Sequence, residues 1–347
     1  MKSVKSFDLE GKRVLLRCDF NVPLSEQGKI TDDFRIRQTL PTIKYLMEKK
    51  AIIILLSHFG RPLEEGSEID KYSLKPVALR LAELLGREVE LMPDCIGEEV
   101  RARIDKMQPG SIALLENLRF HRQEKENDPD FAQQLASLGD VYINDAFGVC
   151  HREHASVSAI TKYLPSGAGL LLEKELKVLN GLLENPLKPL VAIIGGKKME
   201  EKIFLIDSIA RMADWVLIGG LLEREIKEKK TMFSLPEKIV IAVDDIEGFD
   251  IGPKTIELFR EKLGSAKTIF WSGPMGKIEE PRFQKGSEEI MSAIIESGAF
   301  SVAGGGTTVE FINRKGKSSE FNHLSTGGEA MLDLLSGEKL PGIEALQ

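Results

Sequence analysis

Short apolar runs alternate with helix-like stretches along the whole chain, and this alternation restricts the fold more than any other feature of the sequence. Strands that alternate with helices form parallel sheets, which helices cover on both faces. We therefore expect an α/β protein with doubly wound parallel sheets. The apolar runs occupy residues 13–18, 51–57, 111–116 and 140–145 in the first half of the chain, and 190–196, 215–220, 238–243, 267–273 and 300–306 in the second half.

The length and one leucine-rich stretch predict how these sheets are divided. A chain of 347 residues is longer than one ordinary hydrophobic core supports, so we expect two domains. Leu172, Leu176, Leu179 and Leu183 recur at helical spacing between the two halves. This pattern predicts a long helix, residues 171–185, that joins a domain of residues 1–170 to a domain of residues 186–325. Residues 326–347 are expected to return toward the first domain.

The composition excludes several classes of function. With 42% hydrophobic and 29% charged residues, the chain is typical of a soluble globular protein. No apolar run approaches the length of a membrane span, and the first residues lack the apolar stretch of a secretory signal. The net charge of −7 weighs against general nucleic-acid binding. The three cysteines share no metal-ligand spacing, and their odd number argues against a disulfide framework. We expect a cytoplasmic monomer that binds small molecules, without a nucleic-acid or membrane partner.

Basic and polar side chains stand near the strand ends of the first half. Ligands of open α/β sheets bind beyond the carboxyl ends of the strands. A single arginine there is more often a solvated or surface-paired side chain, but several at equivalent strand ends favour a binding site. The planar guanidinium suits carboxylate and phosphate oxygens, so these side chains predict a small, multiply charged anion as ligand. The four arginines are Arg35, Arg61, Arg119 and Arg152. Asp19 and Asn21 could hydrogen-bond a hydroxyl of that ligand.

The strand ends of the second half carry glycine-rich turns instead. They read "GGKK", "IGG", "WSGPMG" and "GGGTT". One such turn means little, because glycine ends many strands, but four favour a nucleotide whose phosphates approach the main chain closely. There is no GxxxxGK[ST], so a P-loop is excluded. Lys198 and Lys202 share a helical face and could neutralise a phosphoryl group during transfer, or form an ordinary solvated face. Together the two halves favour a two-domain small-molecule kinase.

The same segments resemble those of a known family. "LLRCDFNVPL", "LLSHFGRP", "LLENLRF", "NDAFG" and "HREHAS" resemble, in order and spacing, motifs of the phosphoglycerate kinases, and "FWSGPMG", "HLSTGG" and "LPGIEAL" continue the likeness to the C-terminus. The resemblance implies reversible phosphoryl transfer between 1,3-bisphosphoglycerate and ADP, a step of glycolysis, with ATP or ADP and Mg²⁺ bound. It also implies that the triose binds to the N-terminal domain, that the nucleotide binds to the C-terminal domain, and that a hinge closes the cleft.

The resemblance carries roles over to particular residues. The catalytic residues that it implies are Arg35, Lys198 and Lys202. Those implied for the triose are Asp19, Phe20, Asn21, Arg35, His58, Phe59, Gly60, Arg61, Arg119 and Arg152. Those implied for the nucleotide are Lys202, Gly219, Gly220, Glu279, Gly304, Gly305, Gly306, Thr307 and Thr308. Gly327 and Gly328 are implied at a helix end that faces the transferred phosphate.

The sequence departs from the family pattern in its nucleotide half. The family turn "GGGD[ST]" has an aspartate that binds Mg²⁺, and Thr307 stands in its place. "STGGGA" reads "STGGEA", with Glu329 in place of a glycine. Between Gly220 and Asp250 several tens of residues are missing, including a strand that usually helps to form the adenine pocket. The metal ligand therefore stays open: a threonine hydroxyl at 307 or 308, or Glu329, which could alternatively form a helix-capping box with Thr326.

These departures leave three hypotheses for the function. The first and favoured one is a working phosphoglycerate kinase with a shortened nucleotide domain, because phosphoryl transfer depends mainly on positioning and positive charge. The second is a catalytically weak or inactive relative that binds a phosphorylated three-carbon acid as a sensor or partner protein. The third is a kinase that uses a different phosphate donor.

Overall fold

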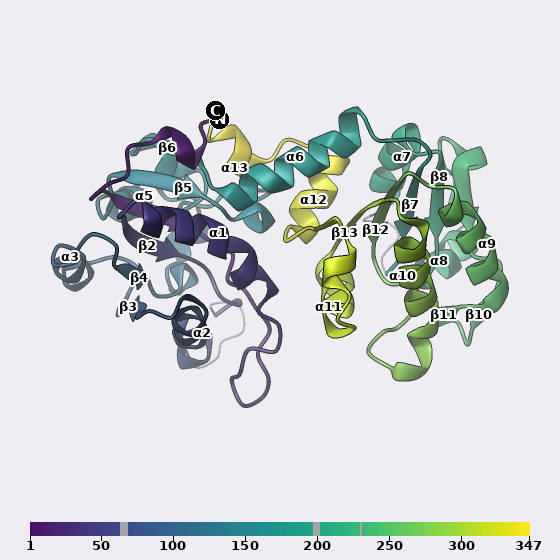
Figure 1. The fold of residues 1–347 in the computed structure, drawn as a ribbon, viewed down its shortest axis with the longest axis horizontal. Coiled ribbons are helices and arrows are strands. Elements are labelled where there is room, and N and C mark those ends of the chain that lie inside the picture. Colours follow the sequence, from purple (N-terminus) through teal and green to yellow (C-terminus); the bar gives the residue numbers. More distant parts are fainter. Residues whose placement is uncertain (63–68, 197–201, 230) are drawn as a thin grey trace. The chain divides into compact units, whose positions relative to one another are not determined.

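The computed structural model describes residues 1–62, 69–196, 202–229 and 231–347, and these form two compact units (Figure 1). The first unit comprises Met1–Leu176 and Lys339–Gln347, and the second comprises Lys177–Glu338. Each unit is built around its own six-stranded parallel sheet. The α/β class and the two doubly wound sheets expected from the apolar runs are confirmed.

The sheet of the first unit has the strand order β3-β4-β2-β1-β5-β6. Its first strand lies inside the sheet, and the chain adds strands on both sides of it, as doubly wound folds do. The strands are β1 (Arg13–Arg17), β2 (Ile52–Leu56), β3 (Glu90–Leu91), β4 (Ile112–Leu114), β5 (Val141–Asn144) and β6 (Ser166–Ala168). The helices of this unit are α1 (Phe34–Glu48), α2 (Lys75–Leu85), α3 (Glu98–Ile104), α4 (Arg122–Lys125), α5 (Pro129–Ala136) and α13 (Pro341–Glu344).

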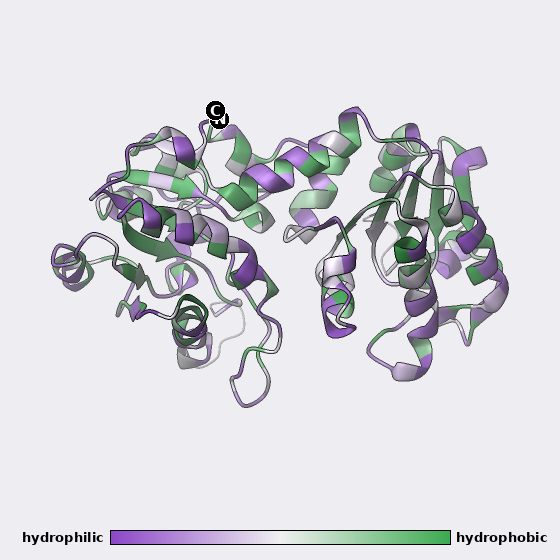
Figure 2. Ribbon diagram, viewed as in Figure 1, coloured by the Kyte–Doolittle hydropathy of each residue, from purple (hydrophilic) through white to green (hydrophobic). Residues whose placement is uncertain are grey.

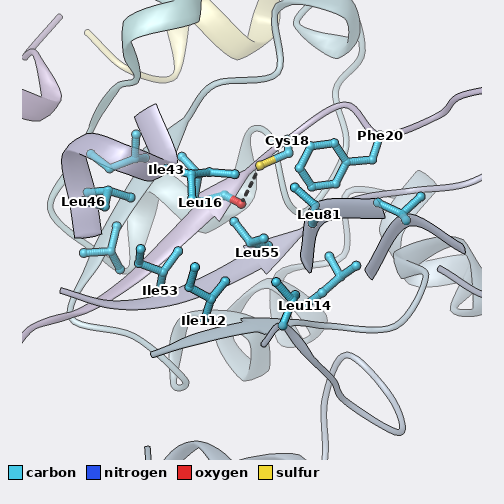
Figure 3. Packing of buried hydrophobic residues seen from close by; sticks show 14 of the residues in the cluster. Leu16, Cys18, Phe20, Ile43, Leu46, Ile53, Leu55, Leu81, Ile112 and Leu114 are labelled. Atoms are coloured by element: carbon cyan, nitrogen blue, oxygen red, sulfur yellow. Dashed lines mark hydrogen bonds between the residues drawn. The ribbon is translucent and has the colours of Figure 1, made fainter. Parts of the chain in front are cut away.

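The register of this sheet lines up apolar side chains across neighbouring strands. Leu16 pairs with Leu55, which pairs with Leu114, so all three point to the same face of the sheet. Ile43 of α1 and Leu81 of α2 belong to the same buried cluster (Figure 3). The hydropathy colouring shows strands that are hydrophobic along their length and helices that are hydrophobic on part of their surface (Figure 2). Full burial of each such leucine or isoleucine contributes about 1.5–3 kcal/mol, so this core holds the strand ends in place.

The sheet of the second unit has the order β14-β13-β12-β7-β8-β9, again with its first strand inside. Its strands are β7 (Leu190–Ile194), β8 (Trp215–Ile218), β9 (Ile239–Ile241), β12 (Thr268–Ser272), β13 (Phe300–Gly304) and β14 (His323–Leu324). Its helices are α7 (Ile203–Met212), α8 (Leu221–Lys229), α9 (Pro253–Gly264), α10 (Lys285–Ser297), α11 (Gly306–Arg314) and α12 (Gly328–Leu335). Helix α7 packs against α12, and α9 packs against α10.

The joining helix is α6 (Leu170–Glu184), where the leucine spacing predicts it. The boundary between the two units falls inside this helix, after Leu176. The chain then leaves the second unit after Glu338, and the amide of Gly342 in α13 donates to the carbonyl of Cys150 in the first unit at 2.8 Å. Among the described residues, no helix has both the length and the apolar character needed to cross a bilayer.

Candidate functional site

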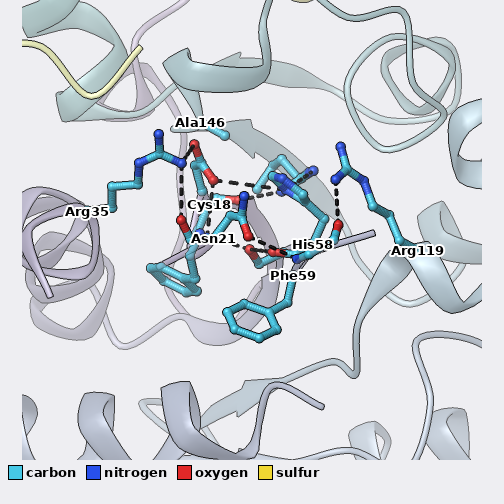
Figure 4. A network of polar contacts seen from close by, with 12 residues as sticks. Cys18, Asn21, Arg35, His58, Phe59, Arg119 and Ala146 are labelled. Atoms are coloured by element: carbon cyan, nitrogen blue, oxygen red, sulfur yellow. Dashed lines mark hydrogen bonds and ion pairs between the residues drawn. The ribbon is translucent and has the colours of Figure 1, made fainter. Parts of the chain in front are cut away.

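The loop after β1 places three of the expected triose residues at the carboxyl end of the first sheet. Asp19 is nearly buried, and Phe20 is fully buried in the apolar core. Arg35, in the first turn of α1, donates to Asp19 Oδ2 at 2.8 Å and to the carbonyl of Asn21 at 3.2 Å. The Asn21 side chain in turn accepts a hydrogen bond from the amide of Gly60 at 2.9 Å. The loops after β1 and β2 are thereby tied together (Figure 4).

The loop after β2 is fixed from behind by an asparagine. Asn117 accepts from the amide of Phe59 at 3.0 Å and donates to its carbonyl at 2.7 Å, so both backbone groups are satisfied. Gly60 has φ +58°, and a Cβ there would lie 2.4 Å from the ring of Tyr72. A side chain at this position is therefore excluded by conformation and by space. The carbonyl of Gly60 accepts from Arg119 at 2.7 Å, which joins a third strand end to the cluster.

His58 lies at the centre of a group of arginines. Burial, together with the positive charges of Arg119, Arg17, Arg35 and Arg152, lowers the pKa of His58 well below its ordinary value. His58 is 3% exposed and stays neutral at physiological pH. A neutral ring can donate one hydrogen bond and accept another among these cations.

Arg119 is a buried cation with little protein counter-charge. Burial, together with the charges of Arg152 and Arg17, lowers its pKa to about 10. Among the described residues no carboxylate pairs with Arg119, and its Nε is buried without a hydrogen-bond partner. A buried charge of this kind is costly unless it is paired, so the cluster is suited to an anionic ligand.

The remaining expected triose residues are less enclosed. Arg152 is half-buried, and its Nε donates to Nε2 of His151 at 2.9 Å. Arg61 is exposed and follows the Gly60 turn directly. The expected residues Asp19, Asn21, Arg35, His58, Gly60 and Arg119 are therefore brought together by direct contacts, Arg152 lies close enough to affect His58, and Arg61 lies at the rim.

Arg17 belongs to the cluster although the sequence analysis did not include it. It is the last residue of β1 and is fully buried, and its Nη2 lies 3.7 Å from the carboxylate of Glu124. Its Nε donates to Ser156 at 2.8 Å, and Ser156 donates to Glu124 at 2.6 Å. The sequence signal for Arg17 was an arginine at the end of an otherwise apolar strand. A charged side chain that is buried with such a strand needs a partner, so it indicates a polar cluster at the strand end.

The second unit holds a pocket of about 410 Å³ at the carboxyl ends of its strands. This volume falls within the range of small-molecule sites. The pocket lies where β7 and β12 adjoin, the point at which the strand order of the sheet changes direction. Its lining residues are Gly196, Lys202, Gly220, Leu221, Ser272, Gly273, Pro274, Gly276, Lys277, Glu279, Gly305, Gly306, Thr307, Thr308, Gly328, Glu329 and Leu332.

Helix N-termini converge on this pocket. Lys202 precedes α7, Leu221 begins α8, Gly306 begins α11 and Gly328 begins α12, and all four residues line it. The first amides of a helix have no intrahelical partners, and the helix dipole adds partial positive charge at that end. The pocket therefore offers backbone N–H groups that have no partner within their own helix, and a field suited to phosphate.

Two glycine turns that meet beside the pocket explain part of its glycine content. Gly273 has φ +93°, and a Cβ there would lie 2.2 Å from the carbonyl oxygen of Gly195. A Cβ on Gly195 would lie 2.2 Å from the carbonyl of Pro274. The turns after β7 and β12 therefore pack backbone against backbone, which leaves no room for side chains.

Two of the glycines expected at the nucleotide do not line this pocket. A Cβ on Gly219 would lie 2.9 Å from Sδ of Met275, and a Cβ on Gly304 would lie 2.2 Å from Sδ of Met331. Both glycines are therefore needed for packing behind the pocket. Gly327, the residue before α12, is buried and also lies outside the lining.

Of the two lysines in the expected catalytic set, Lys202 is among the described residues. Lys202 lines the pocket, and its Nζ donates to the carbonyl of Gly195. Lys198 lies outside the described residues.

The turn after β13 and the start of α12 bring Thr307 and Glu329 to the same pocket. Thr307 is exposed in the first turn of α11. Thr308 is buried, and its hydroxyl accepts from the amide of Gly273 at 2.8 Å, so it also fixes the turn after β12. A Cβ on Gly328 would lie 3.6 Å from Cα of Gly305, so the two helix starts are in contact.

The capping box between Thr326 and Glu329 stays a prediction, because the structure begins this helix one residue later than the box requires. Helix α12 begins at Gly328, and the N-cap position is Gly327, which has no side chain to accept a hydrogen bond. Glu329 is therefore the second helical residue rather than the third. It is exposed and lines the pocket, as Glu279 does from the loop after β12.

One α/β unit carries a basic anion site, and the other carries a pocket of glycine turns and helix N-termini. This arrangement is typical of a two-domain small-molecule kinase. The chain matches the family model of phosphoglycerate kinase over residues 4–232 and 223–338. It belongs to the phosphoglycerate kinase family, whose members are phosphotransferases of glycolysis.

Individual relatives match over nearly their whole length. The phosphoglycerate kinase of Dictyoglomus turgidum is 46% identical over 386 residues, which cover 98% of this chain and 96% of the relative. That of Borrelia hermsii is 42% identical and covers 100% and 99%. The crystal structure of phosphoglycerate kinase from Pyrococcus horikoshii superposes with a TM-score of 0.90 at 32% identity, over 100% of this chain and 98% of that one.

The comparisons also locate a difference in length. The alignment with the Dictyoglomus turgidum relative extends over 386 residues, whereas this chain has 347. The alignment therefore includes residues that this chain lacks. The family match is divided in the region of residues 223–232, which lies between Gly220 and Asp250. In the structure α8 and the edge strand β9 occupy this region. These findings support the prediction that the nucleotide domain is shortened there.

Proposed function

We propose that this protein is a working phosphoglycerate kinase that keeps its triose site and holds Mg²⁺ differently from the family pattern. In this reaction an oxygen of the ADP β-phosphate attacks the acyl phosphate of 1,3-bisphosphoglycerate. The bond from phosphorus to the carboxyl oxygen breaks, which gives ATP and 3-phosphoglycerate. The observation that carries the proposal is the pocket of the second unit, which a protein that bound only the triose would not need.

The basic cluster of the first unit is proposed to hold the triose. Arg119, with its buried and unpartnered Nε, would receive the non-transferred phosphate together with His58, Arg61 and Arg152. Asp19 and Asn21 would bind the hydroxyl and carboxyl end of the triose. Arg35 remains the proposed catalytic residue of this unit, because its guanidinium is held at the edge of the cluster by Asp19 and is 28% exposed. From there it can donate to the oxygens of the transferred group as their charge redistributes.

The pocket of the second unit is proposed to hold ADP or ATP. The helix N-termini and the amides of Gly305 and Gly306 would receive the phosphates, and Lys202 would add positive charge. The carboxylate of Glu279 would accept hydrogen bonds from the ribose hydroxyls. The proposed transfer also requires the two bound ligands to meet, for which hinge bending at α6 stays a prediction.

The donors around the Thr307 turn fit Mg²⁺. This ion prefers a carboxylate with phosphate and water oxygens, and a hydroxyl can replace one of these ligands. Thr307 and Glu329 line the same pocket from two helix starts that are in contact. We propose that Glu329 replaces the family aspartate and that Thr307 contributes its hydroxyl. Bound Mg²⁺ would offset charge on the nucleotide phosphates during transfer.

A pair of substitutions tests this assignment by titration of Mg²⁺. Glu329→Gln should weaken Mg²⁺-dependent ADP binding, measured by calorimetry, by about tenfold or more, since even an outer-shell partner of a metal commonly contributes that much. Thr307→Asp, added to the Glu329→Gln variant, should restore Mg²⁺-dependent ADP binding, because it returns a carboxylate to the neighbouring helix start. Glu279→Gln is the matched control and should weaken ADP binding with or without Mg²⁺. If Glu329→Gln leaves the Mg²⁺ requirement unchanged, Glu329 is not a ligand.

The compartment and the oligomeric state follow from the same proposal. A glycolytic kinase with small-molecule substrates and a net charge of −7 is expected to act as a monomer in the cytoplasm.

A further inference from the structure

Three side chains of different chemistry meet in the first unit. Asp94 and Cys95 lie between β3 and α3, and His121 lies between the 3₁₀ turn Leu118–Phe120 and α4. A carboxylate oxygen, the thiol sulfur and a ring nitrogen of these residues all lie within 4.8 Å of one another. No metal-ligand spacing of Cys95 was predicted from the sequence, because His121 comes from a separate part of the chain.

The contacts of the three side chains orient their donor atoms. Nε2 of His121 lies 2.7 Å from Oδ1 of Asp94. The same oxygen accepts from the amide of Cys95 at 2.6 Å. The ring of His121 also packs against Phe131, with 5.3 Å between the ring centroids. The geometry is therefore held by hydrogen bonds and by aromatic packing, so little side-chain entropy would be lost on binding a ligand there.

The chemistry of the donors selects a class of ligand. One oxygen, one nitrogen and one sulfur donor suit a borderline divalent cation such as Zn²⁺, and not Mg²⁺ or Ca²⁺, which prefer oxygen alone. Three protein ligands leave the fourth tetrahedral position to water. A thiolate and a carboxylate together would match the charge of a divalent ion.

The cluster is open to solvent on one side, so a cation can reach it. Cys95 is fully buried, whereas the side chains of His121 and Asp94 are 24% and 44% exposed. A cation can therefore enter from the side of Asp94 and His121 and meet the sulfur at the back, with release of the thiol proton to solvent.

We propose that Asp94, Cys95 and His121 form a binding site for a Zn²⁺-class cation. The site would join the Asp94–Cys95 loop to the segment that carries Arg119, since the amide of His121 donates to the carbonyl of Leu118 at 3.2 Å. It would thereby fix the position of a segment that contributes to the anion cluster. The proposal is independent of how the second unit binds its nucleotide.

The test is a Co²⁺ titration of the full-length, metal-free protein, followed by absorbance. We expect one equivalent of Co²⁺ to produce the near-ultraviolet band of a cobalt–thiolate bond and the visible bands of a tetrahedral ion, and Zn²⁺ to displace both. Cys95→Ser should abolish the thiolate band. Cys150→Ser, which changes another buried cysteine, should retain it.

Two further variants keep the proposal falsifiable if Cys95→Ser does not fold. Asp94→Asn and His121→Asn affect partly exposed side chains, and each should weaken Co²⁺ binding by more than about tenfold. Circular dichroism of every variant reports whether it is folded. Absence of the thiolate band in the wild-type protein, or equal Co²⁺ binding by the wild-type protein and by folded Asp94→Asn and His121→Asn variants, would overturn the proposal.

Discussion

Arg35 and Arg37 lie two residues apart on α1 and make different contacts. Arg35 reaches Asp19 and the backbone of Asn21 at the anion cluster, whereas Arg37 pairs with Asp33 at the start of the helix and is half exposed. The two side chains have the same charge and the same length. A comparison of the Arg35 and Arg37 variants therefore distinguishes the effect of losing the contact at the anion cluster from the effect of losing one positive charge.

Arg35→Ala should lower kcat by about 10²–10³, the usual effect of removing one donor from the charge that develops in a transition state. KM for 3-phosphoglycerate should change much less, because the proposed contact strengthens only during transfer. Arg37→Ala should leave both parameters close to those of the wild type. Steady-state kinetics with ATP and 3-phosphoglycerate measures this difference. Equal losses in kcat and in affinity for Arg35→Ala would remove the proposed role.

Asp145 is a buried acid that links the fold to pH. It is fully buried, its Oδ1 accepts from the amides of Leu171 and Leu172 at the start of α6, and its Oδ2 has no partner among the described residues. Burial raises its pKa to about 7, although the Thr42 hydroxyl and the amides of Leu172 and Leu171 oppose the shift. In the unfolded chain the same carboxyl titrates near its ordinary pKa of about 3.9.

Because the folded state holds this proton up to a higher pH, the unfolded state binds fewer protons between about pH 4 and about pH 7. The free energy of unfolding should therefore fall as pH rises through this window, by at most about 1.4 kcal/mol per pH unit from this group, and level off above it. Asp145→Asn, which resembles the neutral acid, should reduce this fall. Asp250, with its pKa raised to about 6, accounts for a similar contribution in the second unit. Urea unfolding followed by circular dichroism at several pH values measures how the free energy of unfolding changes with pH. The same pH dependence in the wild type and in Asp145→Asn would contradict the assigned role of Asp145.

At the scale of elements, the apolar runs predicted the main strands of both sheets but missed several very short strands. All nine runs contain strands of the two sheets. Most of these strands are buried on both faces and are therefore apolar along their length, whereas the edge strand β9 is only partly buried. β3, β6 and β14 were not predicted, because they have two or three residues and no continuous apolar run. The structure begins α12 at Gly328, one residue later than the capping box requires, since the exact ends of helices are hard to predict from sequence.

The sites show the same division. The arginines and glycines at strand ends were visible in the sequence because strand direction alone brings them to one edge of a sheet. Arg17 and the Asp94–Cys95–His121 cluster were not visible, because their neighbours come from distant loops that only the packed fold brings together.

The paired glycine turns beside the nucleotide pocket lead to a prediction at this scale. Gly273→Ala would place a Cβ against the carbonyl of Gly195 at a positive φ, so it should destabilise the second unit by about 1–3 kcal/mol and weaken ADP binding. Gly181→Ala in α6 is the matched control, since its Cβ would meet nothing within 4 Å, and it should stabilise the helix by up to about 1 kcal/mol. Trp271 donates from Nε1 to the carbonyl of Gly273 at 2.8 Å, and the other tryptophan, Trp215, lies in the same unit. Tryptophan fluorescence during urea unfolding therefore reports the stability of the second unit. Similar stabilities for the two variants would contradict the packing argument.

At the scale of the whole molecule, the two units differ in how closely they keep the family pattern. The first unit contains the motifs expected for the triose, and its described residues bring most of them into contact. The resemblance places Thr307 where the family has an aspartate, and the family match is divided near α8, yet the second unit has a pocket at the carboxyl ends of its strands. We propose that this unit nevertheless binds the nucleotide together with Mg²⁺.

Calorimetric titration of the full-length protein with ADP, in the presence and absence of Mg²⁺, tests that claim most directly. Titration with 3-phosphoglycerate is the control for the first unit. We expect saturable binding of both ligands near one equivalent each, with ADP bound more tightly when Mg²⁺ is present. Binding of 3-phosphoglycerate without any binding of ADP would contradict the proposal and would favour a protein that recognises the triose alone.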